Sequence, residues 1–298
     1  MRLFRRSLDL TQANFRLSNV ADLNAVARLF RDGMRRYYNL VGADLADLLA
    51  TGHAGVIYAG DEVWAVALIN QPVDHVTWLR GVALTDGLDI STTLSMLFPF
   101  LHTRLQTQGM RSIFYASDET SDTWLVPHLH GQQYIPDTEV IVYEKRDLVI
   151  PSYGNQIVAV RMAQPADLSA LVALDHACFE AQWSKEDVVL RTAIQQGPVC
   201  IVAELQGQIV GYAYATSHFG HRLVHLVRIA VAPHYQGQAI GVRLLAEVIG
   251  FAQRHHATVI TLNTQAHNIP AQRIYRWFGF ATTGERQVIL RCDLHMRS

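Results

Sequence analysis

The amino-acid sequence repeats itself, and this repeat constrains the fold more than any other feature. Residues Phe15–Leu29 align with Val160–Leu174, and Val140–Leu148 align with Arg286–Leu294. The two halves therefore begin alike and end alike, which a tandem duplication explains. A chain of 298 residues is also long enough for two domains that each bury a core of their own.

Composition narrows the class of partner. Hydrophobic residues make up 50% of the chain and the formal net charge is -1. This balance excludes a disordered chain and indicates neither a nucleic-acid nor a membrane surface, so we expect a small partner. No apolar run is long enough to cross a membrane, and the charged N-terminus has no apolar segment behind it, which favours a cytoplasmic protein. The scattered Cys178, Cys200 and Cys292 lack CxxC spacing and indicate reduced thiols, with no zinc site.

The domain organisation follows from a turn-rich segment, Pro151–Asn155, between the two copies. We place the domains at residues 1–150 and 155–298, with the boundary near Ser152. In the second copy, hydrophobic periodicity predicts an α/β (α+β) fold, a mixed sheet flanked by helices. The expected strands are 157–161, 199–205, 209–216, 223–231, 258–263 and 285–294, and the expected helices are 165–179, 185–195, 240–255 and 269–278. The last of these strands is expected to close the second unit.

One segment of the second copy has the features of a phosphate site. In Leu226–Leu245, a hydrophobic strand leads through a Pro-marked turn and a small-residue loop into an amphipathic helix. Gly237, Ala239 and Gly241 let the backbone approach a ligand closely, so that consecutive N–H groups can point at phosphate oxygens. The helix that begins near Ile240 adds the positive end of its dipole. The segment therefore predicts a pyrophosphate site.

A second segment, Asn268–Phe280, reads as a short helix with clear ends. An asparagine caps it, Pro270 lies in its first turn, and it ends at Gly279. Asn268 and Tyr275 are about two helical turns apart, so both lie on one face and can address the same ligand.

These two segments resemble the GNAT N-acetyltransferase superfamily. Gln236–Gly241 fills its Q/R-x-x-G-x-G/A motif with one departure, Ala239 at the middle glycine. Alanine disfavours a positive φ there, but the neighbouring amides remain available. The pattern N-x6-Y-x3-G-F is filled by Asn268, Tyr275 and Gly279-Phe280. The resemblance implies two tandem GNAT-like domains with mixed, mostly antiparallel sheets, and acetyl-CoA as co-substrate.

The resemblance also implies a site and a mechanism. Pantetheine would lie between two parted strands along the backbone of Ile229 and Val231, and an amine would attack the thioester directly. Tyr275 would protonate the departing CoA thiolate, because a phenol with a pKa near ~10 stays protonated at neutral pH. The implied acetyl-CoA-binding residues are Ile229, Ala230, Val231, Gln236, Gly237, Gln238, Ala239, Ile240, Gly241, Val242 and Asn268.

The general base is less clearly indicated. GNAT enzymes that acetylate protein N-termini often carry a glutamate five residues before the motif asparagine, where this chain has Asn263. His225 lies on the predicted strand 223–231, and imidazole titrates in the range needed to accept an amine proton, so His225 is the candidate catalytic base, with Glu204 as a second. The spacing of His218, His221 and His225 suits a metal on a helix, but on a loop and strand these side chains would diverge, so no metal is expected.

The first copy lacks both motifs. Trp78–Leu84 corresponds to the motif strand and continues through Asp86 and Asp89 into a helix without the glycine pattern. Their negative charge is unfavourable beside a pyrophosphate. Thr120 and Pro127 stand where the second copy has its motif asparagine and tyrosine. We interpret residues 1–150 as a degenerate GNAT-like domain that shapes the acceptor cleft, stabilises the catalytic half or binds a separate effector.

Three functions are considered. The first is an acetyl-CoA-dependent N-acetyltransferase that modifies an amine of a small molecule or polypeptide in a ternary complex. The second is a module that senses acyl-CoA or binds a protein without turnover; Ala239 and Asn263 favour it, whereas Tyr275 argues against it. The third, transfer from aminoacyl-tRNA, is disfavoured because the charge balance gives no basic groove. The acceptor pocket would be built from loops 179–187 and 216–222, and the oligomeric state stays open.

Overall fold

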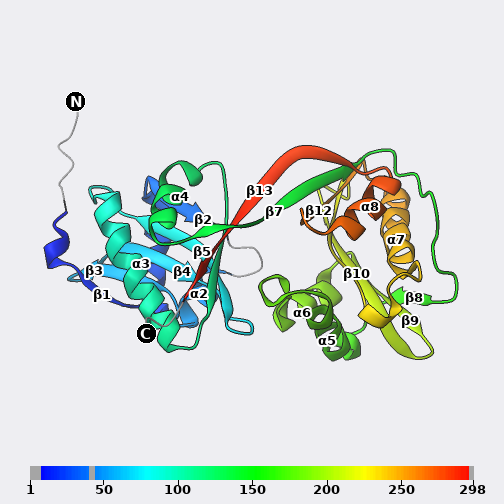
Figure 1. Ribbon diagram of the computed structural model, residues 1–298, viewed down its shortest axis with the longest axis horizontal. Helices are drawn as coiled ribbons and strands as arrows, with labels where there is room; N and C mark the ends of the chain where they lie inside the picture. The colour runs from blue at the N-terminus through cyan, green and yellow to red at the C-terminus, as the bar shows by residue number, and fades with distance from the viewer. Residues whose placement is uncertain (1–7, 40–43, 295–298) are drawn as a thin grey trace. The chain divides into compact units, whose positions relative to one another are not determined.

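The computed structural model describes residues 8–39 and 44–294, which form two compact units (Figure 1). Of these residues, 8–39, 44–138 and 287–294 form unit 1, and 139–286 form unit 2. Each unit is a mixed, mostly antiparallel sheet flanked by helices, so the predicted fold class is confirmed.

The sheet of unit 2 has the strand order β7-β12-β11-β10-β9-β8. Neighbouring strands are antiparallel except β11 and β12, which are parallel. The predicted strands and helices of this copy are present with small shifts at their ends. The strands are β7 (Ile135–Lys145), β8 (Ala159–Met162), β9 (Val199–Leu205), β10 (Gln208–His218), β11 (Leu223–Val231) and β12 (Val259–Gln265).

Helices cover both faces of this sheet because the strands are apolar on both faces. On one face lie α7 (Ile240–Arg254) and α8 (Ile269–Trp277), whose apolar residues form one buried cluster with the sheet (Figure 1). On the other face, α5 (Leu168–Cys178) and α6 (Asp187–Gln196) close a second cluster. The periodicity of α7 explains its position, since Leu244, Leu245, Val248, Ile249 and Ala252 recur at helical spacing and are all buried.

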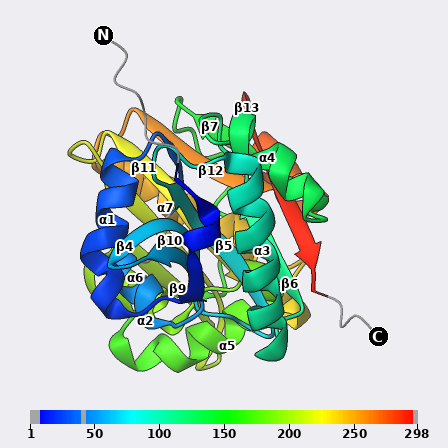
Figure 2. The ribbon, with the colours of Figure 1, turned by 90° about the vertical axis from the view of Figure 1, so that its left-hand side faces the viewer.

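The sheet of unit 1 has the order β1-β3-β4-β5-β6-β13, and β2 pairs with β5 beside it. Helices α1 and α2 lie on one face and α3 and α4 on the other (Figure 2). The strands are β1 (Asn14–Leu17), β2 (Arg35–Tyr38), β3 (Gly55–Ala59), β4 (Glu62–Ile69), β5 (Val76–Leu84), β6 (Ser112–Ala116) and β13 (Ala281–Asp293). The helices are α1 (Leu23–Asp32), α2 (Leu45–Ala50), α3 (Ile90–Thr107) and α4 (Asp122–Gly131). Along the two described stretches of the chain, no helix has the length and apolar character needed to cross a membrane.

The two halves of the sequence exchange their last strands. Strand β7 ends the first copy, but its residues Val140–Lys145 pair with β12 in unit 2. Strand β13 ends the second copy, but its residues Ile289–Asp293 pair with β6 in unit 1. The prediction that strand 285–294 closes the second unit is therefore wrong. Compared with the ranges 1–150 and 155–298, residues 139–154 belong to unit 2 and residues 287–294 belong to unit 1.

The sequence repeat gives the physical reason for the exchange. Because Val140–Leu148 and Arg286–Leu294 are similar, either strand offers the alternating apolar residues that the edge of either sheet needs. The exchanged strands are well packed: Ile141 and Tyr143 lie in the core of unit 2, and Leu290 and Cys292 lie in the core of unit 1. Each unit is thus completed by a strand from the other half of the sequence.

The exchange makes a prediction that a simple tandem arrangement does not. Tyr143→Ala should lower the free energy of unfolding of unit 2 by about 3–5 kcal/mol, because it leaves a cavity at a fully buried aromatic position. The effect falls on unit 2 although Tyr143 belongs to the first copy. Leu290→Ala should lower the free energy of unfolding of unit 1 by about 2–5 kcal/mol for the same reason. Hydrogen exchange measured by mass spectrometry assigns each loss of protection to a unit. The opposite assignment would show that the strands are not exchanged.

Candidate active site

Strands β11 and β12 are paired over only part of their length. Leu223–Leu226 pair with Val259–Leu262, and the two strands then part. At this point β11 contains a β-bulge, because Tyr214 of β10 pairs with Arg228 and the next residue, Ala215, pairs with Leu226. Val227 is the extra residue, and such a bulge bends a strand away from its neighbour. The bulge therefore opens one edge of β11 from Val227 onward.

The backbone of Val231 points toward this open edge. Its carbonyl oxygen accepts from Nε2 of Gln236 at 3.2 Å and from Sγ of Cys178 at 3.3 Å, and neither donor belongs to β10. On the other side, Ala232 N–H donates to Val210 in β10. Since backbone groups alternate in direction along a strand, Ile229 and Val231 both address the open edge. Ala230 pairs with Tyr212 instead, and its side chain packs in the cluster under α5 and α6.

The small-residue loop reaches α7 in the conformation that a phosphate cradle needs. Gly237 has φ 76°, and Ala239, the cap of α7, has φ 57° and ψ 21°. The alanine therefore adopts the left-handed conformation that the motif glycine would favour, at a cost of about 1 kcal/mol. Along α7, Arg243 is the first residue whose N–H forms a backbone hydrogen bond, and it donates to the carbonyl of Ala239. The preceding N–H groups of Ile240, Gly241 and Val242 thus lie at the positive end of the helix dipole.

The remaining motif residues divide between loop and core. Ile240 and Val242 are buried in the core of unit 2, so only their backbone can serve a ligand. Gln236, Gly237 and Gln238 are exposed. A Cβ at Gly241 would meet only Cγ2 of Val231, at 3.7 Å.

A support for this loop comes from the segment that the sequence indicated as a linker. Nδ2 of Asn155 donates to the carbonyl of Gln238 at 2.9 Å, and N–H of Asn155 donates to the carbonyl of Ala239 at 3.1 Å. These two bonds tie the loop before α7 to Asn155. Gly154 fits below the loop because a Cβ there would lie 2.6 Å from the oxygen of Ala239. The Gly-Asn dipeptide was the only signal in the sequence, and a turn explained it equally well.

Helix α8 brings Asn268 and Tyr275 to the same face of the sheet as α7. Oδ1 of Asn268 accepts from Ala271 N–H at 3.3 Å and so caps the helix. Tyr275 is 6% exposed, and its hydroxyl makes no hydrogen bond with any residue in the described part of the chain. Burial raises the pKa of Tyr275 to about 12. The phenol therefore stays protonated at every physiological pH and is available as a donor.

The exchanged strand β7 supports this helix. The ring of Tyr143 lies 6.1 Å from that of Tyr275, and its hydroxyl donates to Oε1 of Gln272 at 3.2 Å. Arg276 donates to both of these oxygens, and Gln272 in turn donates to the carbonyl of Ala266 at 2.7 Å. A tyrosine from the first copy thus fixes the helix that carries the candidate acid.

His225 lies where β11 and β12 are still paired, on the sheet face opposite Tyr275. Its Nδ1 is 2.9 Å from Oγ1 of Thr261. Burial, and then the nearby charges of His218 and Lys185, lower the pKa of His225, so it is neutral at neutral pH. Glu204 of β9 is instead paired at 3.0 Å with Arg161 of the edge strand β8.

The histidine series does not form a metal site. His218 contacts Thr216, His221 contacts Ser217 and stacks on His255, and His225 contacts Thr261. Within residues 8–39 and 44–294, no three His, Cys, Asp or Glu side chains are grouped to hold a metal ion.

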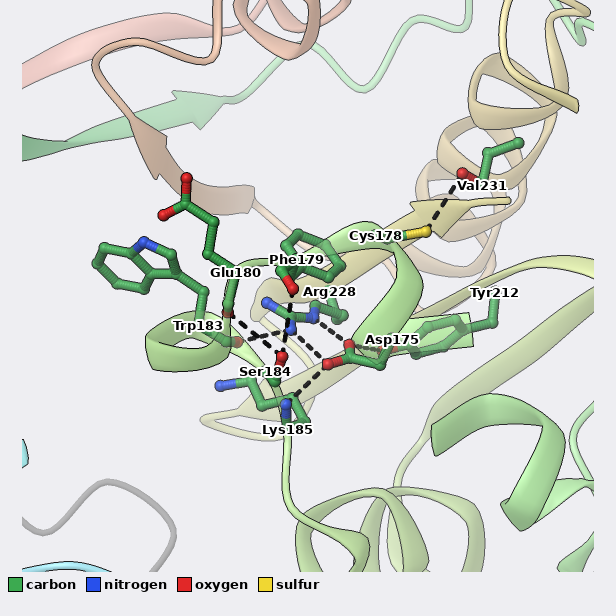
Figure 3. Close-up of polar contacts among 10 residues, drawn as sticks. All are labelled: Asp175, Cys178, Phe179, Glu180, Trp183, Ser184, Lys185, Tyr212, Arg228 and Val231. Atoms are coloured by element: carbon green, nitrogen blue, oxygen red, sulfur yellow. Dashed lines mark hydrogen bonds and ion pairs between the residues drawn. The ribbon is translucent and has the colours of Figure 1, made fainter. Parts of the chain in front are cut away.

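The segment after α5 packs against Arg228 of β11, which forms a buried ion pair with Asp175 of α5 (Figure 3). Nε of Arg228 donates to Oδ2 of Asp175 at 2.6 Å, and Nη2 donates to Oδ1 at 2.7 Å. Nη2 also donates to the carbonyl of Trp183 at 2.6 Å, and the guanidinium carbon lies 3.4 Å from the ring centre of Phe179. The sequence alone did not indicate this pair, because its members are far apart in the chain.

Residues 168–280, which include the open edge of β11, the loop before α7, and α8, match the Acetyltransferase (GNAT) family. This stretch of unit 2 is a GNAT-family sequence.

Known proteins are similar to this chain over part or most of its length. N-acetylaspartate synthetase of Danio rerio is 36% identical over 86 residues, which are 29% of this chain and 30% of that protein. A Bacillus subtilis protein assigned as a ribosomal protein bS18 alanine N-acetyltransferase is 25% identical over 133 residues, 43% of this chain and 84% of its own length. A tandem GNAT protein from the clavulanic acid pathway shares the fold over 96% of this chain and 100% of its own, with a TM-score of 0.57 and 10% identity. The chain thus spans less than a third of the Danio rerio relative.

The corresponding positions of unit 1 are occupied by its own residues. Parallel pairing of β5 with β6 ends at Trp78, and β5 carries a bulge at Arg80, as β11 does at Val227. Here, however, β2 pairs with Gly81–Leu84 along the opened edge. The carboxylate of Asp89 caps α3 by accepting from Thr92 N–H at 2.8 Å. Both elements of an acyl-CoA site, the open edge and the free helix terminus, are therefore filled in unit 1.

The support from Asn155 can be tested without an acceptor. Asn155→Ala removes the side-chain bond to Gln238 and should weaken acetyl-CoA binding by roughly 5- to 10-fold, because the loop loses a bond worth about 1 kcal/mol that orders it. Isothermal titration calorimetry measures the change. Asn263→Ala, at an exposed position of β12, serves as the control and should bind acetyl-CoA as the natural protein does. Equal affinity of both variants would contradict the assigned role.

Proposed function

We propose that the protein is an acetyl-CoA-dependent N-acetyltransferase in which unit 2 carries the site. The observation that carries the proposal is the open edge of β11 between a free helix N-terminus and the phenol of Tyr275. These three features offer groups for the three parts of acetyl-CoA: backbone amides for the pyrophosphate, a strand edge for pantetheine, and a donor for the sulfur. Acetyl-CoA would supply the activated thioester carbonyl.

The residues around the gap would act from two sides. The N–H groups of Ile240, Gly241 and Val242 would bind the pyrophosphate, and the backbone of Ile229 and Val231 would hold pantetheine as an added strand. Asn268 would keep the first turn of α8, and with it Tyr275, in place. Gln236 and Cys178 now bond the carbonyl of Val231 and would yield it to a pantetheine amide.

Tyr275 would stabilise the leaving thiolate from the α8 side. With a pKa of about 12, its phenol is a weaker acid than an ordinary thiol, whose pKa is about 8.5. Full proton transfer to the sulfur is therefore uphill, and a hydrogen bond to the developing thiolate is the main contribution. His225, on the opposite face of the sheet, is the candidate to accept the proton of the attacking amine.

The acceptor would be the amine of an amino acid or of a polypeptide N-terminus. The names of these two relatives include an acetylated aspartate and a ribosomal-protein alanine, and both suggest amines of amino-acid units. L-aspartate and a peptide that begins with alanine are thus the first acceptors to test.

The first experiment is a titration with acetyl-CoA. We expect the protein to bind one acetyl-CoA per chain with a micromolar dissociation constant, because unit 1 has its edge and helix terminus filled. Gly241→Glu should abolish binding by bulk and charge at the cradle, and the space around Gly241 means that the variant should still fold. If the unaltered protein binds no acetyl-CoA, the proposal fails. If binding occurs without turnover of any amine, the acyl-CoA-sensing alternative replaces it.

The acid and base roles predict different pH behaviour. If His225 accepts the proton, kcat/KM falls as pH drops through its pKa, which lies below the ordinary value of about 6.5. His225→Gln should remove this acidic limb of the pH profile. Tyr275→Phe should instead lower kcat by roughly 10²-fold at every pH while acetyl-CoA affinity is kept. An acidic limb that persists in His225→Gln would assign the base to another group.

A further inference from the structure

The two copies differ at one pair of positions that face each other between helix and sheet. In the repeat, Phe30 of α1 corresponds to Asp175 of α5, since each directly follows the aligned segments that end at Leu29 and Leu174. Gly81 and Arg228 also correspond, because each directly follows the bulge residue of its strand. Unit 2 therefore has an aspartate and an arginine where unit 1 has a phenylalanine and a glycine.

In both units these residues are in contact. A Cβ added to Gly81 would lie 2.8 Å from Cζ of Phe30, so the ring fills the space above the strand. In unit 2 the same space is filled by the ion pair, with side chains 8% exposed for Arg228 and 0% for Asp175. The contact is thus present in both copies, but its chemistry has changed from apolar packing to a charged pair.

The segment that follows the helix takes a different course in the two units. In unit 1 it runs into the gap beside β5 as strand β2, where Tyr37 is buried and donates to the carbonyl of Ala116 in β6 at 3.0 Å. In unit 2 it forms a short turn at Ala181–Trp183 and stays on the α5 side, and the gap beside β11 remains open. The two units therefore differ both in the residue pair between helix and sheet and in the path of the segment that follows the helix.

The ion pair in unit 2 touches this segment at three places (Figure 3). Phe179 lies against the guanidinium, the carbonyl of Trp183 accepts from Nη2, and N–H of Lys185 donates to Oδ1 of Asp175 at 2.7 Å. Tyr212 of β10 donates to Oδ2 of the same carboxylate. A buried ion pair with this many hydrogen-bond partners favours one position of the segment, because moving the segment away would leave buried charge without its partners.

We propose that Asp175 and Arg228 are positioning residues that hold residues 179–186, the acceptor loop, as the wall of the acceptor site and away from the gap beside β11. This inference rests on the proposed function, because it assigns the acceptor side of that same site. The pair acts on the loop and not on the acetyl-CoA cradle, which lies at the far end of β11 and is held by Asn155.

The test removes the pair without leaving an unpaired charge. Asp175→Asn with Arg228→Met replaces both partners by neutral groups of similar size, which a folded core tolerates better than loss of one partner. The control is Asp167→Asn with Arg161→Met, which removes another two-point Arg–Asp pair of unit 2, at the opposite end of α5. Each protein is measured as the full chain by amide hydrogen exchange, acetyl-CoA calorimetry and acetyl transfer to L-aspartate and to the alanine peptide.

We expect exchange in residues 179–186 to rise roughly tenfold in the test variant and not in the control. Acetyl-CoA affinity should stay within about twofold, while the KM for the acceptor rises by roughly fivefold or more. Unchanged protection of the loop in the test variant would overturn the proposal, and so would a loss of acetyl-CoA affinity as large as the change in KM.

Two further points keep the test decisive. If the double variant does not fold, Arg228→Lys keeps the charge but cannot bond Asp175 at two points and Trp183 at once, so it should loosen the loop alone; full protection in this variant overturns the proposal. If the natural protein acetylates no amine, the proposed function fails. The amide hydrogen exchange of residues 179–186 still decides whether the ion pair orders the loop.

Discussion

A sheet can open between two strands only if other groups take over the backbone hydrogen bonds that the strands give up. Both units of this protein face that constraint at the same place, just after a β-bulge where two parallel strands part. Unit 1 meets it with its own chain, since β2 adds to the free edge of β5. In unit 2 no strand of the described chain pairs with the edge of β11 beyond Leu226 on the β12 side, and the carbonyl of Val231 accepts instead from a side-chain amide and a thiol. The difference between a filled and an available edge separates the structural copy from the copy with a candidate active site.

The exchanged strands couple the two copies at the level of single side chains. Because β7 completes unit 2, Tyr143 of the first copy packs beside Tyr275 and fixes Gln272 and Arg276 on α8. In the repeat, Ile289 corresponds to Tyr143, and an isoleucine there could not make these polar contacts. The first copy therefore contributes a strand and a tyrosine to the unit that carries the candidate active site.

Local patterns predicted most of unit 2, and non-local choices explain the failures. The motif strand, its loop and the helix ending at Gly279 follow from periodicity and glycine chemistry within a few residues. The destination of β7 and β13 could not be predicted, since two similar strands satisfy either edge equally well by local criteria. Strand β2 has no local signal, because Arg35-Arg36-Tyr37-Tyr38 shows no apolar alternation and its position depends on the gap that it fills. The partnership of Asp175 with Arg228, and of Asn155 with the phosphate loop, depends on the folded path and has no local signal.

The position of β13 also determines when the protein can finish folding as it is made. Its last residues pair with β6, and Oγ of Ser112 donates to Oδ1 of Asp293, 181 residues later in the sequence. While the ribosome is still translating the second copy, β6 has no outer neighbour, and such an unpaired edge is prone to wrong pairings. Contacts between residues so distant in sequence also form slowly, because a long loop must close first. Unit 1 therefore stays incomplete until β13 has been translated, whereas unit 2 needs only residues 139–286.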